Sequence, residues 1–304
     1  LINMVKALII GCGNIGGLYD LENDNIQTHA KAISKNDWIE NVDVFDINID
    51  LQKKICEKYD FNGLNFDEKI NFKKYNIVCI NTPTNTHFQY LKLCLESNVR
   101  LIVCEKPISN SIGELDEVMS LYNSSESKIV VNYFRRFLTS YLHLKNKINF
   151  KKKELKKIHV KYYKGFLNNC GHAFDTIEFL IETKLTPTNI KVLKKDFDFF
   201  KDDPTISANF YSNDIEFNVQ GFDLNHKTFE ILFKFVNQEI LIKDSGNKIE
   251  ISQNGILNFE FDDLLKNYMA DVYSEIKNIY FDEKLRDNFN DSVMLNRQQI
   301  LNFI

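Results

Sequence analysis

A short apolar run, Val5 to Ile10, is followed at once by glycines at the spacing G-x-G-x-x-G. Such a run is typical of a buried parallel strand. Glycine permits a tight turn and lets backbone N–H groups approach a pyrophosphate at a helix N-terminus, where the helix dipole favours an anion. The feature therefore predicts a strand, a turn and a helix that bind a dinucleotide, although a lone match would equally suit a plain glycine turn. The expected cofactor-binding residues of this motif are Gly11, Gly13, Asn14, Ile15 and Gly16.

An acidic residue, Asp46, ends the next apolar run. A carboxylate at the end of the second strand can accept hydrogen bonds from the adenosine ribose. The 30 positions between Gly16 and Asp46 exceed the ~20 typical of this fingerprint, so we expect an insertion, with the polar segment 17–26 as the candidate, beside the phosphates or the pocket mouth. Ile47 and Asn48 offer no basic group for a 2′-phosphate, which favours NAD over NADP.

Polar segments follow two further apolar runs, Ile77 to Ile80 and Leu101 to Cys104. Ligands of open α/β sheets bind at the carboxyl ends of the strands, so both segments are expected at the cofactor crevice. Either segment alone would suit an ordinary strand-to-helix turn, but together with the glycine motif they favour a cofactor site. The cofactor-binding candidates in them are Asn81, Thr82, Pro83, His87, Glu105 and Lys106.

The order of the expected elements changes near residue 123. Before it, apolar runs alternate with stretches of helical period, which predicts a doubly wound parallel sheet in residues 1–123. After it come an apolar strand-like run at 129–134 and, between 190 and 251, successive strand-like segments separated by turn signals. We therefore expect residues 124–304 to form an α+β domain with a largely antiparallel, open-faced sheet. Helical periods predict further helices at 137–148, 173–181, 264–279 and 292–303.

Composition argues against several classes of function. Lys and Arg number 38 against 42 Asp and Glu, a net charge of −4, so nucleic acid is not an expected partner. No run reaches the ~18 apolar residues of a membrane-spanning helix, and no basic segment precedes an apolar signal core, so we expect a cytoplasmic protein without membrane association. The six cysteines form no C-x-x-C pair, which predicts reduced thiols and no metal site.

Five motifs appear in an order that resembles one known family. They are Gly11 to Gly16, Asp46, Asn81-Thr82-Pro83 with His87, Glu105-Lys106-Pro107, and Asn132 to Phe137. Together they resemble the Gfo/Idh/MocA superfamily of NAD(P)-dependent oxidoreductases over most of the chain. The resemblance implies an N-terminal Rossmann domain, a C-terminal α/β domain on a largely antiparallel sheet, and oxidation or reduction of sugars, cyclitols or nucleotide sugars. It also implies that Lys106 is catalytic.

A second family motif, D-x-G-x-H-x-x-D, is present in altered form at the start of a helix. His172 takes the place of the family's catalytic histidine and Asp175 that of the later acid, whereas Asn168 stands where the first Asp is expected and the glycine is displaced by one. With Lys164 just before it, the segment resembles a branch of the family that carries an N-N-x-x-H version.

Oxidation of a secondary alcohol requires a hydride acceptor and a group that takes the hydroxyl proton. Imidazole, with an ordinary pKa of ~6.5, suits that exchange, so His172 is the expected acid and base. Lys106 can stabilise developing alkoxide charge, and Asn168 can orient the imidazole or the substrate without lending it negative charge. The expected substrate-binding residues are Lys106, Tyr133, Arg135, Lys164, Asn168, His172 and Asp175.

Other interpretations of these residues remain open. His87 suits a helix cap or a support of the cofactor loop, and Arg135 and Arg136 suit structural ion pairs as well as substrate phosphate. Asn168 keeps a different function open, namely a non-catalytic dinucleotide-binding regulator of the same fold. Retention of both Lys106 and His172 favours the enzyme.

The segment 228–236 predicts how the second sheet is used. Phe229, Ile231, Phe233 and Phe235 alternate on one face, which must pack on the domain's own helices, while Leu232 and Val236 leave the other face partly apolar. Further phenylalanines in neighbouring strands add to the apolar surface: Phe197, Phe199, Phe210, Phe217 and Phe222. Large exposed apolar patches are rare on soluble monomers, and family members commonly associate through this sheet, so we expect a homodimer or homotetramer.

Overall fold

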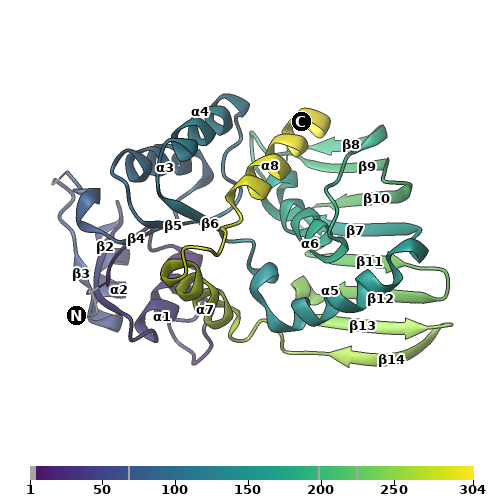
Figure 1. Cartoon of the computed structure of the whole chain (residues 1–304), viewed down its shortest axis with the longest axis horizontal. Helices are drawn as coiled ribbons and strands as arrows, with labels where there is room; N and C mark the ends of the chain where they lie inside the picture. The colour runs from purple at the N-terminus through teal and green to yellow at the C-terminus, as the bar shows by residue number, and fades with distance from the viewer. Residues whose placement is uncertain (1–4, 68, 198, 224) are drawn as a thin grey trace. The chain divides into compact units, whose positions relative to one another are not determined.

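The computed structural model describes residues 5–67, 69–197, 199–223 and 225–304. In it the glycine motif follows the first strand in the sequence of a six-stranded parallel sheet (Figure 1). The strands run in the order β3-β2-β1-β4-β5-β6, and every neighbouring pair is parallel. Their near-continuous apolar sequences fit burial on both faces. The strands are β1 (Val5–Ile10), β2 (Ile39–Phe45), β3 (Asn62–Gly63), β4 (Ile77–Ile80), β5 (Leu101–Cys104) and β6 (Lys128–Val131).

Helices cover both faces of this sheet. Figure 1 shows α3 (His87–Glu96) and α4 (Ile112–Asn123) on one face and α1 (His29–Ser34), α2 (Ile49–Tyr59) and α7 (Tyr268–Phe281) on the other. The buried residues of α7 recur every three or four positions, as a helix that packs one face on a sheet requires. They are Met269, Val272, Tyr273, Ile276, Ile279 and Tyr280. The doubly wound Rossmann arrangement expected from the sequence is confirmed.

The chain forms two units, and their boundary differs from the one expected near residue 123. The first unit takes the described residues up to Phe134 and adds Lys266–Val293, and the second takes Arg135–Leu265 and Met294–Ile304. The strand expected at 129–134 in the second domain is β6, Lys128–Val131, which pairs in parallel with β5 and so completes the first sheet. The sequence could not predict that α7 belongs to the first unit, because an amphipathic pattern does not show which of two sheets a helix covers.

The long spacing before Asp46 corresponds to a loop. After the glycines the chain makes one π-helical turn, Asn14–Leu18, and the next helix, α1, begins only at His29. The helix expected directly after the motif is therefore reduced to a single turn. The loop is held from within by the fully buried Asp20, whose carboxylate accepts the backbone N–H groups of Gln27 and Thr28 at 2.6 and 2.9 Å.

The second unit is built on an eight-stranded sheet. The strand order is β14-β13-β12-β11-β7-β10-β9-β8, in which β7 and β10 are parallel and the other described neighbours are antiparallel. The largely antiparallel sheet expected for this region is thus confirmed. Its strands are β7 (Lys157–Tyr163), β8 (Thr188–Asp196), β9 (Thr205–Ser212), β10 (Ile215–Phe222), β11 (Glu230–Lys234), β12 (Gln238–Lys243), β13 (Lys248–Gln253) and β14 (Ile256–Phe261).

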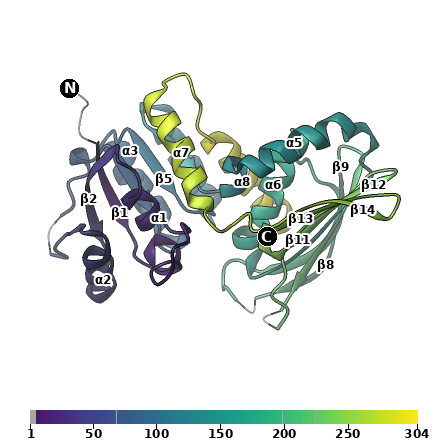
Figure 2. The same cartoon turned by 90° about the horizontal axis from the view of Figure 1, so that it is seen from below.

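Helices lie on one face of this sheet. Figure 2 shows α5 (Thr139–Lys151) and α6 (Gly171–Ile181) on that side. The C-terminal part of α8 (Phe289–Phe303) belongs to the same unit and packs the Phe303 ring against Phe166 and Phe210. The alternation expected in β11 is present, because Ile231 and Phe233 are fully buried beneath these helices. Phe210 and Phe217 also lie in this core, where their rings stack at 4.7 Å, so part of the apolar surface expected outside is in fact inside.

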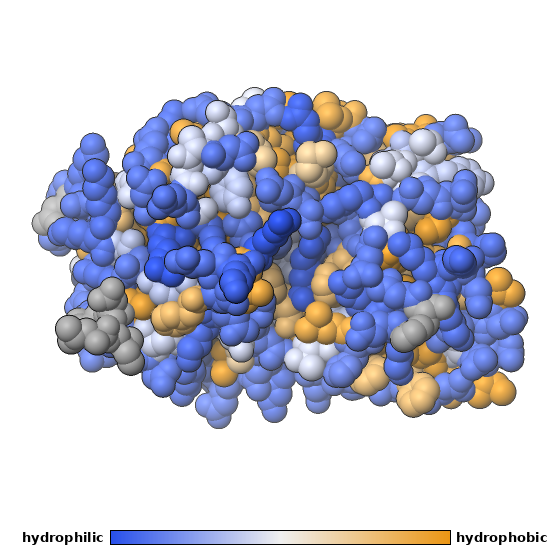
Figure 3. Space-filling model, in the orientation of Figure 1, coloured by the Kyte–Doolittle hydropathy of each residue, from blue (hydrophilic) through white to orange (hydrophobic). Residues whose placement is uncertain are grey.

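The opposite face of the sheet, here called the open face, carries cross-strand ion pairs. Lysine ammonium groups lie 2.6–3.1 Å from glutamate carboxylates of neighbouring strands. The pairs are Lys157–Glu216, Lys161–Glu230 and Lys234–Glu239. Figure 3, drawn from the helical side of this sheet, shows mainly hydrophilic residues with apolar residues scattered between them. Within the described parts of the chain, no helix is long and apolar enough to cross a membrane.

Candidate functional site

The glycine motif forms a cradle that a side chain would fill. Gly11 has a φ of +94°, and a Cβ there would lie 2.8 Å from the backbone carbonyl of Asn81. A Cβ on Gly16 would lie 2.1 Å from the carbonyl oxygen of Gly11. Both positions therefore require glycine, and the turn brings its backbone close to the end of β4.

Asp46 lies at the end of β2 and braces this turn. One carboxylate oxygen accepts the N–H of Cys12 at 2.6 Å, and the other accepts the N–H of Asn48 at 2.7 Å. Gln52, which the sequence analysis did not identify, accepts the N–H of Asp46 itself at 3.0 Å. An ionised carboxylate has about four acceptor sites, so Asp46 can still accept ribose hydroxyls while it holds the turn.

Asn81, just after β4, has a buried side-chain amide without a hydrogen-bond partner in the described structure. Its side chain is 8% exposed, and neither its Oδ1 nor its Nδ2 has a hydrogen-bond partner among the described residues. Such unsatisfied groups cost about 1–3 kcal/mol each and are uncommon in folded proteins. Together with the glycine cradle and the Asp46 carboxylate, this amide fits a dinucleotide that lies across the ends of β1, β2 and β4.

His87 connects the polar segments after β4 and β5. Its Nε2 lies 2.7 Å from the carbonyl oxygen of Thr82 and its Nδ1 lies 2.8 Å from that of Pro107, while the ring is buried. Burial lowers its pKa, so the neutral ring donates its single N–H to one of these two oxygens. These contacts favour the interpretation of His87 as a support of the cofactor loop. Pro83 precedes a short 3-10 turn, Thr84–Thr86, in the same segment.

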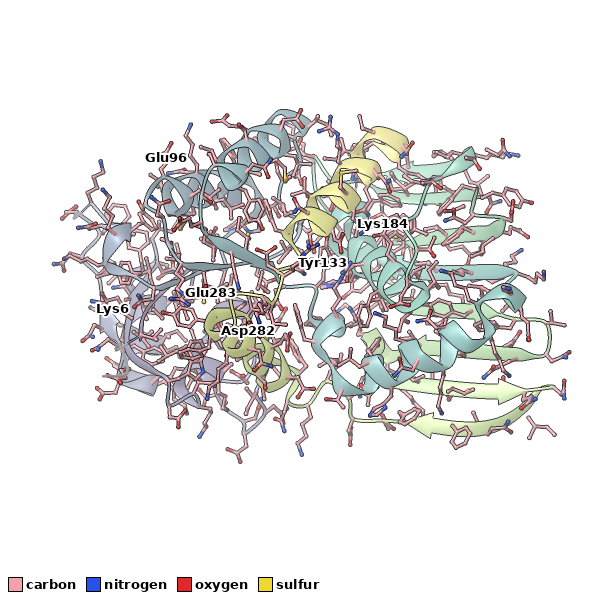
Figure 4. The ribbon with its side chains drawn as sticks, in the orientation of Figure 1. Lys6, Glu96, Tyr133, Lys184, Asp282 and Glu283 are labelled. Carbon is pink, nitrogen blue, oxygen red and sulfur yellow. The ribbon has the colours of Figure 1, made fainter. Side chains whose placement is uncertain are left out.

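The turn after β5 holds Glu105 and Lys106. The Glu105 carboxylate is buried and accepts hydrogen bonds from His29 at 3.1 Å and Asn132 at 2.6 Å. Burial raises the pKa of Glu105, but the hydrogen bond and charge of His29 outweigh it, so the net pKa lies below the ordinary value. Lys106 follows directly and is half-buried. Tyr133, labelled in Figure 4, is buried just after β6.

In the second unit, a π-helical turn, Gly165–Cys170, leads from β7 into α6. Asp203, 4% exposed, holds this turn by accepting the N–H of Leu167 at 2.7 Å and that of Asn168 at 2.9 Å. Gly165 has a φ of +83°, and a Cβ there would lie 2.3 Å from the Asp203 carboxylate, so only glycine fits. Lys164, just before the turn, is exposed and left-handed, with a φ of 68°.

His172 lies in the first turn of α6, half-buried, directly after the turn that Asp203 holds. Asp175, one helical turn later, is fully buried and accepts a hydrogen bond from Nε of Arg136 at 2.6 Å. Burial raises the pKa of Asp175 to about 7, and the Arg136 charge opposes this rise. Arg135 is 4% exposed, donates to the carbonyl oxygen of Ser245 and lies 4.5 Å from the Phe229 ring centroid. These contacts favour the structural alternative for Arg135 and Arg136, and they occupy one oxygen of Asp175, which was expected to bind substrate, with Arg136.

Each unit thus assembles its own group of expected site residues. The first unit gathers the glycine motif, Asp46, Asn81 and Glu105-Lys106 at the carboxyl ends of its strands. The second gathers Lys164, Asn168 and His172 around one turn. The sequence analysis missed the supporting roles of Gln52, Asp203, His29 and Asn132. Asn132, at the start of the Asn132 to Phe137 motif, and Asp203, which precedes Pro204 in a turn-like segment, carried a local signal.

A family model described as an oxidoreductase family with an NAD-binding Rossmann fold, Gfo/Idh/MocA, matches residues 5–133. Residues 5–133 therefore match the Gfo/Idh/MocA family of oxidoreductases. This match indicates an oxidoreductase with a nicotinamide dinucleotide cofactor, and the glycine cradle and Asn81 fit that cofactor. A comparison with curated proteins found no match.

Solved structures of similar fold cover nearly the whole chain. A dehydrogenase from Clostridium difficile is 16% identical with a TM-score of 0.75, and 99% of each chain is covered. A 3-ketoreductase from Actinomadura kijaniata, in complex with NADP and TDP-benzene, is 9% identical with a TM-score of 0.79, covering 98% of this chain and 96% of the other. A UDP-N-acetylglucosamine 3-dehydrogenase from Acidithiobacillus ferrooxidans is 13% identical with a TM-score of 0.76, at 98% and 96% coverage. At these identities the likeness shows the fold.

Proposed function

We propose that the protein transfers a hydride between NAD and a secondary alcohol or ketone of a sugar or nucleotide sugar. The binding of a dinucleotide is supported above all by one observation, the buried amide of Asn81, which has no hydrogen-bond partner in the described structure and lies beside the glycine cradle. The substrate class is supported by the names of two structures of similar fold, a 3-ketoreductase bound to TDP-benzene and a UDP-N-acetylglucosamine 3-dehydrogenase.

The chain's own residues then have distinct roles. The nicotinamide supplies the hydride acceptor or donor. Lys106 donates a hydrogen bond to the substrate oxygen and stabilises the charge that develops there. His172 takes the hydroxyl proton during oxidation and returns it during reduction. Asn168 orients the substrate or the imidazole by hydrogen bonding, and the backbone of Asn168 is itself fixed by Asp203.

The preferred cofactor is NAD(H). Asp46 presents a carboxylate at the ribose end of the site, and the residues that follow it, Ile47 and Asn48, carry no positive charge. A 2′-phosphate placed beside that carboxylate would be repelled.

The first test is turnover of NAD⁺ with a panel of UDP- and TDP-sugars, followed by absorbance of the reduced nicotinamide. Lys106→Ala and His172→Ala should each lower kcat by about 10²- to 10⁴-fold while the affinity for NAD⁺ stays nearly intact. Unchanged turnover in the His172 variant would remove it from the mechanism. Binding of NAD⁺ without turnover on the whole panel would instead favour the non-catalytic regulator. Asn168→Asp is a useful companion, because a gain in rate would show that the family acid is still useful in this position.

We also propose a homo-oligomer that associates through the open face of the eight-stranded sheet. Leu232 and Leu241, which are paired across β11 and β12, give this face a partly exposed apolar centre among its ion pairs.

A further inference from the structure

A buried polar cluster in the first unit lies behind the turn that carries Lys106. We call it the His29 cluster. Its members come from five places in the fold, namely α1, β4, α7 and the residues just after β5 and β6. All of them are less than a tenth exposed, and three, His29, Cys79 and Tyr273, are fully buried. The cluster consists of His29, Cys79, Glu105, Asn132 and Tyr273.

The cluster is one connected chain of hydrogen bonds. Nε2 of His29 lies 3.1 Å from Oε1 of Glu105, and Nδ1 of His29 lies 2.8 Å from the hydroxyl of Tyr273. That hydroxyl lies 3.3 Å from Sγ of Cys79. Asn132 donates its side-chain N–H to the same Glu105 oxygen at 2.6 Å. The imidazole is therefore held on both sides, by Glu105 on one and by Tyr273 on the other.

An ionised carboxylate at this depth requires a compensating charge. Removing a carboxylate from water costs several kcal/mol unless a cation and further hydrogen bonds replace the water. Burial disfavours the charged imidazole, but Cys79 and the Glu105 carboxylate outweigh it and raise the pKa of His29 to about 9. With the pKa of Glu105 lowered, the two groups form an ion pair at neutral pH.

Glu105 is joined to Lys106 by a single peptide bond, so whatever fixes Glu105 also fixes the backbone of Lys106. We propose that His29 is a positioning residue for Lys106, acting through the Glu105 carboxylate, with Tyr273 orienting its imidazole. The inference rests on the proposed function, in which Lys106 contacts the substrate oxygen. Balanced by the imidazolium, Glu105 does not add its full negative charge to the surroundings of the lysine.

The rest of the first unit is arranged to hold His29 in place. His29 begins α1 directly after the loop that Asp20 closes. The N–H of Ile26 in that loop donates to the carbonyl oxygen of Lys266 at 3.2 Å and to the side chain of Asn267 at 3.0 Å. The inserted loop before α1 and the segment before α7 are therefore hydrogen-bonded to each other. The two helices that follow them supply His29 and Tyr273.

The experiment measures the reactivity of the Lys106 amine, which requires no substrate. Wild type, His29→Gln and Tyr273→Phe are labelled with a trace of acetic anhydride at pH 8, and acetylation of Lys106 and of Lys92, a half-buried lysine on α3 that lies outside the cluster, is quantified by peptide mass spectrometry. Without the imidazolium, the Lys106 ammonium is the remaining cation that lowers the pKa of Glu105, so the Glu105 carboxylate stabilises that ammonium more strongly and lowers the reactive fraction of the amine. We expect Lys106 to react about three- to tenfold more slowly in His29→Gln, given that one pKa unit is tenfold, with a smaller effect in the same direction in Tyr273→Phe. Lys92 should be unaffected.

Tyr75→Phe is the matched control. It also removes a buried tyrosine hydroxyl from a 2.8 Å hydrogen bond in the first unit, to Asp43, but it does not touch the cluster. With a nucleotide sugar that the wild type turns over, His29→Gln should lower kcat at least about tenfold and leave KM within about twofold. The reason is that Lys106 stabilises charge that develops in the transition state, so its displacement affects the rate more than substrate binding. The control should keep the wild-type values.

An unchanged Lys106 labelling rate in folded His29→Gln would overturn the inference, whatever the protein's substrate. If His29→Gln does not fold, an unchanged labelling rate in Tyr273→Phe would overturn it equally. Failure of the proposed function would give a different result. The wild type would turn over none of the sugars, while the difference in Lys106 labelling between wild type and His29→Gln would remain.

Discussion

Single residues at the strand ends carry most of the chemistry in the first unit. Asp46 accepts two backbone N–H groups and still has acceptor sites to offer, whereas Asn81 has an amide with no partner in the described structure. The first residue shapes the turn, and the second leaves two polar atoms that the proposed dinucleotide would satisfy. Both types of residue were identifiable from sequence, because carboxyl ends of parallel strands are where ligands bind.

Cofactor preference provides a prediction for Asp46. Wild type should bind NADP(H) at least about tenfold more weakly than NAD(H), which corresponds to about 1.4 kcal/mol. Asp46→Asn keeps the size of the side chain but removes the charge that repels a 2′-phosphate, so the ratio of the affinities for NAD(H) and NADP(H) should become smaller. Titration calorimetry with both dinucleotides measures this. Equal or tighter binding of NADP(H) by the wild type would show that the preference is wrong.

The His29–Glu105 ion pair provides a prediction about pH. The pKa of His29 is about 9 in the folded protein against ~6.5 when unfolded, so its stabilisation is complete below pH ~6.5 and is lost as the pH rises through about 9. The difference in unfolding free energy between wild type and His29→Gln should therefore shrink over this window by up to about 3 kcal/mol. Trp38, the single tryptophan, packs against Tyr280 in the first unit, so its fluorescence reports the unfolding of the unit that contains His29. A difference that stays constant with pH would mean that the pair is not ionised in the way described.

At the scale of elements, the periodic ones were predictable and the irregular ones were not. Apolar runs gave β1, β4 and β5, and alternation gave β11, because burial on two faces or on one leaves a direct pattern in the sequence. The pattern could not tell that β6 belongs to the first sheet, since strand pairing is a tertiary choice. Likewise, the break of the first helix into a π-helical turn and α1 depends on Asp20, which binds residues seven and eight positions later.

The turn before α6 provides a prediction for Asp203. Asp203→Asn turns an amide N–H toward one of the two backbone donors, which should cost about 1–3 kcal/mol of stability. It should also lower kcat, because the same turn carries Asn168 and leads into His172. Asp287→Asn is the matched control, since Asp287 accepts the backbone N–H groups of Ile129 and Phe289 in the first unit. Urea unfolding and steady-state kinetics should separate the two variants. Equal loss of stability with equal kcat would leave Asp203 with a purely structural role.

The open face of the eight-stranded sheet is the surface through which we propose that the whole chain associates with a second copy. The expectation of a large apolar patch there is only partly met, because Phe210 and Phe217 lie in the core and lysine–glutamate pairs cross the strands. Charged pairs of this kind are weak on an exposed surface, but they leave few unpaired charges to be buried when two such faces meet. A two-fold interface places the same patch on both partners, so the Leu232–Leu241 pair of one copy would lie on or near that of the other.

This geometry predicts a dimer or tetramer that Leu232→Lys dissociates, because the added ammonium would be buried without a partner at the apolar centre of the interface. Light scattering at micromolar concentration measures the mass of each protein. Leu301→Lys is the control, since Leu301 is an exposed leucine, 64% accessible, on α8 rather than on the sheet, and it should leave the mass unchanged. A wild-type mass near the 35.7 kDa of a single chain would contradict the proposal outright. An oligomer that survives Leu232→Lys but not Leu301→Lys would move the interface from the open face to the helical side of the unit.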